Sequence, residues 1–475
     1  MPLPTHGSPR ADVLSSLERM REGDLDWRSG RAFAYVYDAG PEVERVAKEA
    51  YAAYLSENAL DPTVLPSVLR LENEVVGMAA AHLGGDGATV GNFTSGGTES
   101  ILLAVKSARD HAREVRKIDR PQIALPITAH AAFHKAAHYL GLEVVDVAVD
   151  PTSFRADPDA VRTAIGPRTA LVVASASSYA HGVVDPVREI AAIAAERGVL
   201  CHVDGCIGGF LLQYFRRLGD AVPDFDLSVP GVTSISMDLH KYAFCPKGAS
   251  VVLYRSKELR RHQIFSSARW TGYAMVNATV QSSKTAGPIA AAWAVMHHLG
   301  DDGYLAVARD LLGARRALTK GLAGAGLEVM GAPEMCLIAF RSDALDVFEL
   351  GDALRGRGWY VQPQLGFGPS KANLHLSVQP GNVRWVDAFV SDLAPAADEA
   401  RRAPKPDGGL LAMAAGLRPA DVADNLPILL GAAGLTPGAG LPAKMAGVNR
   451  VLDALPKDVL EIVLREYWNE IFAPR

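Results

Sequence analysis

The sequence predicts an α/β protein whose larger part is built on a mostly parallel β-sheet. From about residue 61 to residue 300, short apolar or β-branched runs alternate with amphipathic helical segments, which is the pattern of a parallel sheet covered by helices. The chain has 475 residues, of which 49% are hydrophobic and 21% are charged. This length and composition predict a folded protein with two or three domains around sizeable apolar cores.

Several runs in this region have the composition of buried strands and are bounded by turn residues. They are Gln122–Pro126, Glu143–Val147, Ala170–Ala174, Leu200–Val203, Ser234–Met237 and Ser250–Tyr254. Amphipathic helices separate several of these strands. Residues 186–198, for example, place Val187, Ile190 and Ala194 on one helical face, and Gly198 is a typical C-terminal stop.

The regions on either side predict further units. Residues 1–60 predict an N-terminal arm or helical packing segment. Residues 301–400 predict a smaller α+β domain, with strands at 328–330 and 335–340 and a helix at 345–357. Residues 401–475 predict a helical C-terminal extension punctuated by Pro and Gly, to which the sequence assigns no role.

The composition excludes several classes of protein. A net charge of -5, with no block of one sign, indicates no nucleic-acid partner. The four cysteines lack paired spacings, so we expect reduced thiols and neither a metal site nor a disulfide framework. Pro and Asp interrupt the N-terminus where a signal peptide would be apolar. The apolar runs are shorter than the roughly 20 residues of a membrane span, so we expect a cytoplasmic protein without a transmembrane segment.

The first motif with chemical meaning is TSGGTES at Thr94–Ser100, which precedes a helical run. Gly96 and Gly97 let the backbone approach an anion closely, and the hydroxyls of Ser95 and Thr98 add donors. The N-terminus of the following helix favours negative charge. The motif therefore predicts a phosphate cradle, although a helix N-cap with a capping box would use the same residues.

The second motif is Asp238-Leu239-His240-Lys241, directly after the expected strand Ser234–Met237. A lysine there can form a Schiff base with an aldehyde, but only as the neutral amine. Partial desolvation that lowers its pKa from about 10.4 would suit this chemistry. An ordinary solvated lysine is the alternative for Lys241 taken alone.

Two further residues follow strands. Asp204 ends the strand Leu200–Val203, at the sheet edge where open α/β sheets bind ligands, and its carboxylate could keep a pyridine nitrogen protonated. His130 stands at the head of a helix after the strand Gln122–Pro126, and its imidazole could stack on an aromatic ring. Capping of a turn or a helix is the alternative for each residue taken alone. Four such features occur at successive strand-to-helix junctions: the phosphate cradle, the histidine, the aspartate and the lysine. Chance explains this order poorly.

These residues resemble the fold-type I pyridoxal-phosphate enzymes, and within them the sphingosine-1-phosphate lyase branch of the group II decarboxylase family. The similarity covers roughly residues 60–300 and rests on the segments TSGGTES, HAAFHKAA, HGVVDP, HVDGCIGGFLL and GVTSISMDLHKYAFCPKGAS. The resemblance implies an aspartate aminotransferase-like fold, pyridoxal 5'-phosphate as cofactor, and a homodimer with shared active sites.

The resemblance also implies roles for individual residues. Lys241 would form the internal aldimine, Asp204 would pair with the pyridinium, and His130 would stack on the ring, which makes these three the catalytic candidates. The remaining cofactor contacts would be Ser95, Gly96, Gly97, Thr98, Ser177 and His240.

Two segments depart from the lyase pattern. The family's NPLHPD motif, whose histidine helps to bind substrate phosphate, reads Asn58-Ala59-Leu60-Asp61-Pro62-Thr63 here, and an aspartate would repel phosphate. A segment close to GSRPG in the family reads Ser282-Ser283-Lys284-Thr285-Ala286, so a lysine replaces a bidentate arginine. With Asn58, Asp61 and Lys284, the remaining candidate substrate contacts are Tyr35, Tyr37 and Lys247.

We therefore expect a pyridoxal-phosphate-dependent lyase that cleaves a β-hydroxy amine by a retro-aldol step into an aldehyde and an amine. The wording DGCIGGF and DLHKYAFCPKG favours this outcome. An amino-acid decarboxylase is the alternative, because both reactions use the same electron sink. A catalytically silent homologue that keeps the fold is a third hypothesis.

Overall fold

The computed structural model describes residues 2–404, 407–422, 428, 431 and 442–473. A seven-stranded sheet runs through the larger part, in the order β1-β7-β6-β5-β4-β2-β3. All its strands are parallel except β7, which runs antiparallel to both β1 and β6. The strands are β1 (Val90–Thr94), β2 (Gln122–Pro126), β3 (Glu143–Val147), β4 (Thr169–Ser175), β5 (Leu200–Asp204), β6 (Ser234–Met237) and β7 (Ser250–Tyr254).

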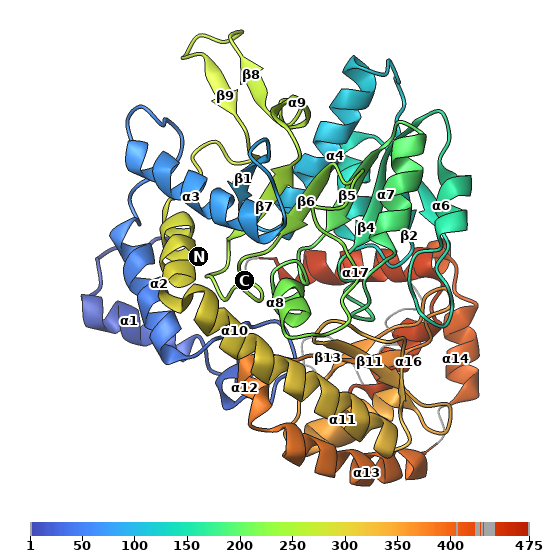
Figure 1. Cartoon of the computed structure of the whole chain (residues 1–475). Helices are drawn as coiled ribbons and strands as arrows, with labels where there is room; N and C mark the ends of the chain where they lie inside the picture. Colours follow the sequence, from blue (N-terminus) through green and yellow to red (C-terminus); the bar gives the residue numbers. More distant parts are fainter. Residues whose placement is uncertain (1, 405–406, 423–427, 429–430, 432–441, 474–475) are drawn as a thin grey trace.

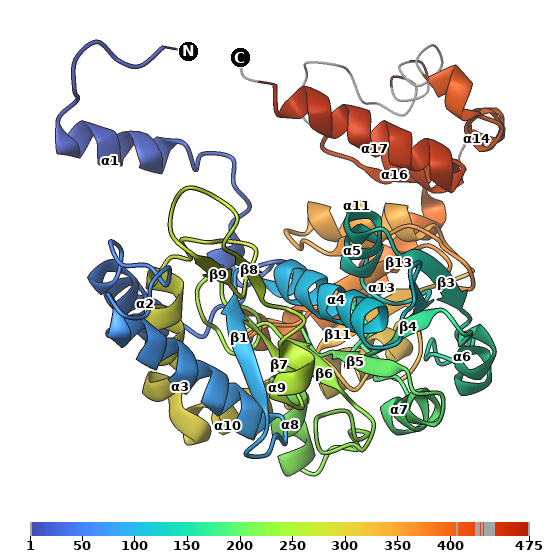
Figure 2. The same ribbon diagram turned by 90° about the horizontal axis from the view of Figure 1, so that it is seen from above.

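Helices cover both faces of this sheet (Figure 2), which is why strands such as β4 are buried along their whole length. Leu171 and Val173 of β4 pack in the apolar cluster of one face, with α4 (Gly97–Glu114) and α5 (Ala132–Leu140). Val172 and Ala174 point to the opposite face. The helices of that face are α3 (Pro66–His82), α6 (Pro158–Ala164), α7 (Val187–Glu196) and α8 (Leu211–Arg217).

The predicted strands of the large sheet are confirmed, and one strand was missed. β1 was not predicted because its sequence, VGNFT, carries Gly and Asn where a strand is usually apolar. A Cβ at Gly91 would lie 2.5 Å from the carbonyl oxygen of Val252 on β7. The close approach of the two backbones therefore requires glycine.

A second, antiparallel sheet has the order β10-β11-β13-β12 and lies below the large sheet in Figure 1. Its strands are β10 (Glu328–Val329), β11 (Leu337–Arg341), β12 (Gln362–Gln364) and β13 (Asn373–Ser377), and α11 (Val347–Gly356), α12 (Pro380–Val383) and α13 (Val386–Arg402) pack nearby. The long helix α10 (Gly287–Gly324) joins the two parts and kinks at Gly300. The boundary expected at residue 300 falls at this kink, and the domain limits stay a prediction.

The ends of the chain add helices on one side of the molecule (Figure 2). The N-terminal region carries α1 (Arg10–Arg19), whose residues are all at least partly exposed, and α2 (Pro41–Ala53). The C-terminal region carries α14 (Gly408–Ala415), α16 (Ala446–Ala454) and α17 (Lys457–Ile471), which share an apolar cluster. A short helix α9 (Lys257–Arg260) and a hairpin of β8 (Phe265–Ser267) and β9 (Met275–Asn277) complete the described α-helices and strands. Among all the residues that the structure describes, no helix is both long enough and apolar enough to span a membrane.

Candidate active site

Lys241 lies in the loop that follows β6, at the carboxyl edge of the parallel strands. Its Nζ is 2.9 Å from Oδ2 of Asp238, a carboxylate that is only 3% exposed. Nε2 of His240 lies 3.6 Å from the same oxygen. Since Asp204 ends β5 and is paired in register with Ser236 of β6, the two predicted polar strand ends come together as expected.

Asp238 controls the protonation of this cluster. Burial of the Lys241 ammonium acts to lower its pKa, but the negative charge of Asp238, with smaller contributions from Cys206 and Tyr37, raises the pKa overall. Burial acts to raise the pKa of the Asp238 carboxyl, yet the positive charges of Lys241 and His240 hold that pKa below the usual range. The charge of Asp238 thus opposes the lowered Lys241 pKa that would suit Schiff-base formation, and the sequence alone does not reveal how close the two charges lie.

The glycine turn before α4 faces this cluster. A Cβ at Gly97 would lie 2.8 Å from both carboxylate oxygens of Asp238, and a Cβ at Gly96 would lie 3.4 Å from Cε1 of His240. The carboxylate of Glu99 accepts hydrogen bonds from the backbone of Ser95 at 2.6 Å and of Val280 at 2.7 Å. Glu99 thus fixes the turn and ties it to the loop after β9, while Gly96 and Gly97 leave the space in front of His240 and Asp238 free of side chains.

Asp204 is buried at the end of β5, where its Oδ1 accepts a hydrogen bond of 3.0 Å from the backbone of Cys206. Ser177 follows the neighbouring strand β4, and its hydroxyl is buried. Within the described residues, the Ser177 hydroxyl, Oδ1 of Asp238 and Nδ1 of His240 have no hydrogen-bond partner. Buried polar atoms are rarely left unpaired unless a ligand or water completes them.

These observations test whether the residues fit pyridoxal phosphate. The glycine turn at the head of the 18-residue helix α4 suits a phosphate. The unpaired polar atoms beside it provide further hydrogen-bonding capacity, and the amine of Lys241 lies in the same cluster. The residue types and their placement fit a phosphorylated aldehyde cofactor.

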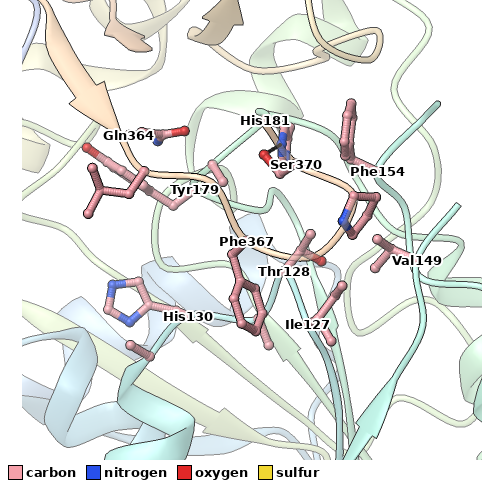
Figure 3. A pocket seen from close by; sticks show the side chains of 15 residues that line it. Ile127, Thr128, His130, Val149, Phe154, Tyr179, His181, Gln364, Phe367 and Ser370 are labelled. Atoms are coloured by element: carbon pink, nitrogen blue, oxygen red, sulfur yellow. Dashed lines mark hydrogen bonds between the residues drawn. The ribbon is translucent and has the colours of Figure 1, made fainter. Parts of the chain in front are cut away.

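His130 lies at the edge of a cavity of about 340 Å³ (Figure 3). The imidazole is exposed, and its Nδ1 accepts a hydrogen bond of 3.1 Å from the backbone of Ala132. Tyr179 lines the same cavity and donates a 2.6 Å hydrogen bond to Gln362. Burial raises the pKa of the Tyr179 phenol, while the charge of Lys241 acts to lower it, so the phenol lies within electrostatic reach of that ammonium.

Three of the candidate substrate residues gather near Lys241. Nζ of Lys247 donates a 3.3 Å hydrogen bond to the carbonyl oxygen of Tyr35 and lies 4.9 Å from the ring centre of Tyr37. Burial lowers the pKa of Lys247, and the charge of Lys241 adds to this effect. Burial raises the pKa of Tyr37, while the charge of Lys241 acts to lower it. Lys247, Tyr35 and Tyr37 therefore form one group beside the lysine loop.

The other three candidates gather elsewhere. Asn58 and Thr285 form an isolated β-bridge, so the two segments that depart from the family pattern lie side by side. Asp61 is exposed and caps a turn by accepting hydrogen bonds from Thr63. Lys284 is buried, and its Nζ donates to Glu72 at 2.7 Å and to the carbonyl oxygen of Phe93 at 3.1 Å. The side chains of Asp61 and Lys284 thus have partners within the chain.

Sequence reasoning missed Asp238, Glu99 and Tyr179 as members of the site. Asp238 stands in the motif that identified Lys241, and a carboxylate three residues before a reactive lysine was the available signal. Glu99 belongs to TSGGTES, where it looked like a capping residue. Tyr179 follows the polar run Ser175–Ser178 at the end of β4, and polar residues at a strand end were again the signal.

Comparison with known protein families gives two matches. The model described as "Pyridoxal-dependent decarboxylase conserved domain" matches residues 4–343. The model described as "Pyridoxal-dependent enzyme, C-terminal putative HTH domain" matches residues 408–470. The second match covers most of the extension that the sequence left without a role.

Individual relatives agree with the first match. The chain is 39% identical to the sphingosine-1-phosphate lyase of Arabidopsis thaliana over 84% of this chain and 74% of that protein. It is 35% identical to the enzyme of that name from Saccharomyces cerevisiae, over 89% and 73% of the two chains.

Solved structures agree as well. The sphingosine-1-phosphate lyase of Burkholderia pseudomallei superposes with a TM-score of 0.81 at 37% identity, over 84% of this chain and 93% of that one. The glutamate decarboxylase of Lactobacillus brevis, with a TM-score of 0.74 over 85% of this chain and 96% of that one, is 19% identical and shows the shared fold alone.

Proposed function

Because the chain belongs to the pyridoxal-dependent decarboxylase family and is a pyridoxal-phosphate-dependent lyase, we propose that it cleaves the carbon–carbon bond of a β-hydroxy amine. The products would be an aldehyde and a smaller amine. The proteins named sphingosine-1-phosphate lyase, at 35–39% identity, support a sphingosine-1-phosphate-like amino alcohol as the substrate. The observation that carries the proposal is the Lys241–Asp238–His240 cluster in front of the glycine turn.

We propose the following roles for the residues of the site. Lys241 binds the cofactor covalently, and Asp204 holds a proton on the ring nitrogen. The phosphate is held by Ser95, Gly96, Gly97, Thr98 and His240, with Ser177 as a further contact and His130 against the ring face. When bound, the cofactor supplies an electron sink for the negative charge that develops at the amine-bearing carbon. Asp238 pairs with Nζ of Lys241 and orients it.

The substrate contacts are proposed on the same basis. Lys247, with Tyr35 and Tyr37, would bind an anionic group of the substrate beside the lysine loop. Asn58, Asp61 and Lys284 stay candidates at a second location, where the internal partners of Asp61 and Lys284 argue for a structural contribution.

We also propose a homodimer in the cytoplasm. The exposed apolar residues of α1 and the turn after it, Val13, Leu14, Leu17 and Met20, support a second copy that covers them. The four cysteines are all free and buried, which fits a reducing compartment. Sedimentation equilibrium of the purified protein tests the dimer, and a monomer at micromolar concentration would contradict it.

The function is tested with purified protein, pyridoxal phosphate and sphingosine-1-phosphate. We expect a visible absorbance band of the bound cofactor and release of a long-chain aldehyde, and we expect both to be lost in Lys241→Ala. The decarboxylase alternative predicts no aldehyde from this substrate and release of carbon dioxide when an L-amino acid is supplied instead. Neither product from a protein that binds the cofactor would identify a silent homologue, and a protein that never acquires the band would contradict the assignment.

A further inference from the structure

A short turn forms the outer wall of the cavity beside His130. Phe367 and Ser370 exchange two backbone hydrogen bonds, of 2.8 and 3.0 Å, and both residues line the cavity (Figure 3). The turn, residues 366–370, belongs to the connection between β12 and β13 and is called the wall turn below. Because the wall turn comes from the smaller sheet, its position over the cavity depends on what holds it there.

On one side the wall turn is attached to the large domain. Nε2 of His181 is 3.0 Å from the hydroxyl of Ser370. The His181 ring stacks on Phe154 with ring centres 4.0 Å apart, and the histidine is 1% exposed. Burial lowers the pKa of His181 to about 4, so the ring is neutral near pH 7 and this contact stays uncharged.

On the other side the wall turn is attached to the C-terminal module, residues 408–470. Oδ1 of Asp453, at the end of α16, accepts a 2.6 Å hydrogen bond from the backbone N–H of Gly366. Leu365, next to it, packs against the apolar cluster of the module. The module is itself anchored to α11, where Nε of Arg450 lies 2.6 Å from Oδ2 of Asp346. A chain of contacts therefore runs from α11 through α16 to the wall turn.

The cavity has the character of a site for an apolar chain. Its lining includes Ile127, Val149, Phe154, Leu365, Phe367 and Pro369. His130, which is proposed above to lie against the cofactor ring, and Tyr179 line the side of the cavity away from Val149 and Phe154 (Figure 3). A volume of about 340 Å³ lies at the lower end of the roughly 300–1,000 Å³ of small-molecule pockets. A chain of medium length would extend from the reacting amine into this space.

We propose that this cavity binds the hydrocarbon chain of the substrate amine, and that the C-terminal module sets the accepted chain length by holding the wall turn through Asp453. The inference rests on the proposed function, because it presumes an amine held near Lys241. Asp453 acts as a positioning residue, since it contacts the wall turn and not the chain.

The charge of the module favours this role over nucleic-acid binding. Residues 408–470 contain five Lys and Arg against seven Asp and Glu. A helix-turn-helix that binds DNA needs a basic surface to neutralise phosphates. The excess of acidic residues, together with the anchor at Arg450, is what a module that serves its own enzyme would show.

The chain site is tested by binding of n-alkylamines from hexylamine to dodecylamine to the holoenzyme, measured by calorimetry. Each methylene that leaves water should lower the dissociation constant about fourfold until the cavity is filled. Phe367→Ala, at a residue that is 55% exposed, should weaken this dependence, whereas Phe472→Ala, at a residue that is 68% exposed and directly follows α17, should not. Equal affinity for all chain lengths in the wild type would overturn the proposal.

The role of the module is tested by Asp453→Ala. We expect about tenfold weaker binding of decylamine with less than twofold change for hexylamine, and in turnover a raised KM for long-chain substrates at unchanged kcat. Asp453→Asn keeps an oxygen acceptor for Gly366 and should restore binding, and Asp458→Ala, an exposed aspartate of the same module, should match the wild type. Equal weakening for both amines, or none, would overturn the positioning role.

These measurements separate the inference from the proposed function. Alkylamine binding does not require cleavage, so a chain-length dependence without aldehyde release would contradict the lyase proposal alone. Aldehyde release without a chain-length dependence would contradict the inference alone.

Discussion

Lys241 and Lys284 both pair with a buried carboxylate, but their surroundings differ. Nζ of Lys284 is 2.7 Å from Glu72 and also donates to the carbonyl oxygen of Phe93. The other oxygen of Glu72 accepts from the backbone of Phe93 at 3.0 Å and from the side chain of Asn92 at 3.3 Å. This pair is complete within the chain, and it joins α3 and β1 to the segment before α10.

The pair of Lys241 is incomplete. One oxygen of its partner Asp238 and Nδ1 of the neighbouring His240 have no hydrogen-bond partner in the described part of the chain. Gly96 and Gly97 let the backbone of the turn approach both residues closely. The comparison teaches that a buried ion pair marks a ligand site when its hydrogen-bonding capacity exceeds what the chain provides, and a structural contact when it does not.

The largest effect is expected from removing the incomplete pair. Lys241→Ala should lower kcat/KM by more than about 10³-fold, because no other group can replace a covalent attachment. Steady-state kinetics measure this loss. Lys371→Ala, at an exposed lysine that pairs with Asp343, is the matched control and should retain wild-type rates. Substantial turnover by Lys241→Ala would place the reactive amine elsewhere.

Breaking the complete pair of Lys284 and Glu72 should lower the stability of the folded protein. Lys284→Met leaves Glu72 buried without a partner charge, so the free energy of unfolding should fall by about 3–5 kcal/mol. Urea titration followed by circular dichroism measures it, and the double variant with Glu72→Gln should recover part of the loss. A raised KM at unchanged stability would instead make Lys284 a substrate contact.

The close approach of the glycine turn to the incomplete pair is tested by Gly97→Ala. The added methyl would meet Asp238 at 2.8 Å and Sγ of Cys206 at 2.9 Å, and we expect cofactor binding to weaken by about 1–3 kcal/mol. Titration of the visible absorbance with pyridoxal phosphate measures the dissociation constant. Gly313→Ala on α10, where an added Cβ meets nothing within 4 Å, should bind as the wild type does.

The smallest effect concerns pH and a buried histidine behind the site. Burial lowers the pKa of His202 to about 4, so the unfolded chain takes up this proton more readily. The free energy of unfolding should therefore decrease as the pH falls from about 6.5 towards 4, by about 1.4 kcal/mol per pH unit. Burial raises the pKa of Asp185 to about 6, which acts in the opposite sense. His202→Gln should flatten the decline in urea titrations, and an unchanged slope would contradict it.

Much of the fold followed from local patterns. The strands from Gln122 to Tyr254 were predictable because each is a short apolar run between turn residues, and four of them, β2, β3, β6 and β7, begin and end where expected. The strand Val90–Thr94 was not predictable, because its glycine is explained only by the close approach of β7, a strand that lies far along the chain. Asp204 and Lys241 were predictable because each stands at the end of a recognisable strand, and the glycine turn was predictable because its motif directly precedes a helical run.

The sequence by itself determined the alternation of strands and helices and the order of polar residues at the strand ends, because periodicity and turn chemistry are local properties. Only the tertiary structure decided which of the two lysine–carboxylate pairs has all its hydrogen bonds within the chain. It also decided whether the pKa of Lys241 is raised or lowered. It alone brought Asp453 to Gly366, across 87 residues of sequence. These outcomes depend on distances between residues that are remote in the chain, and no local pattern encodes such distances.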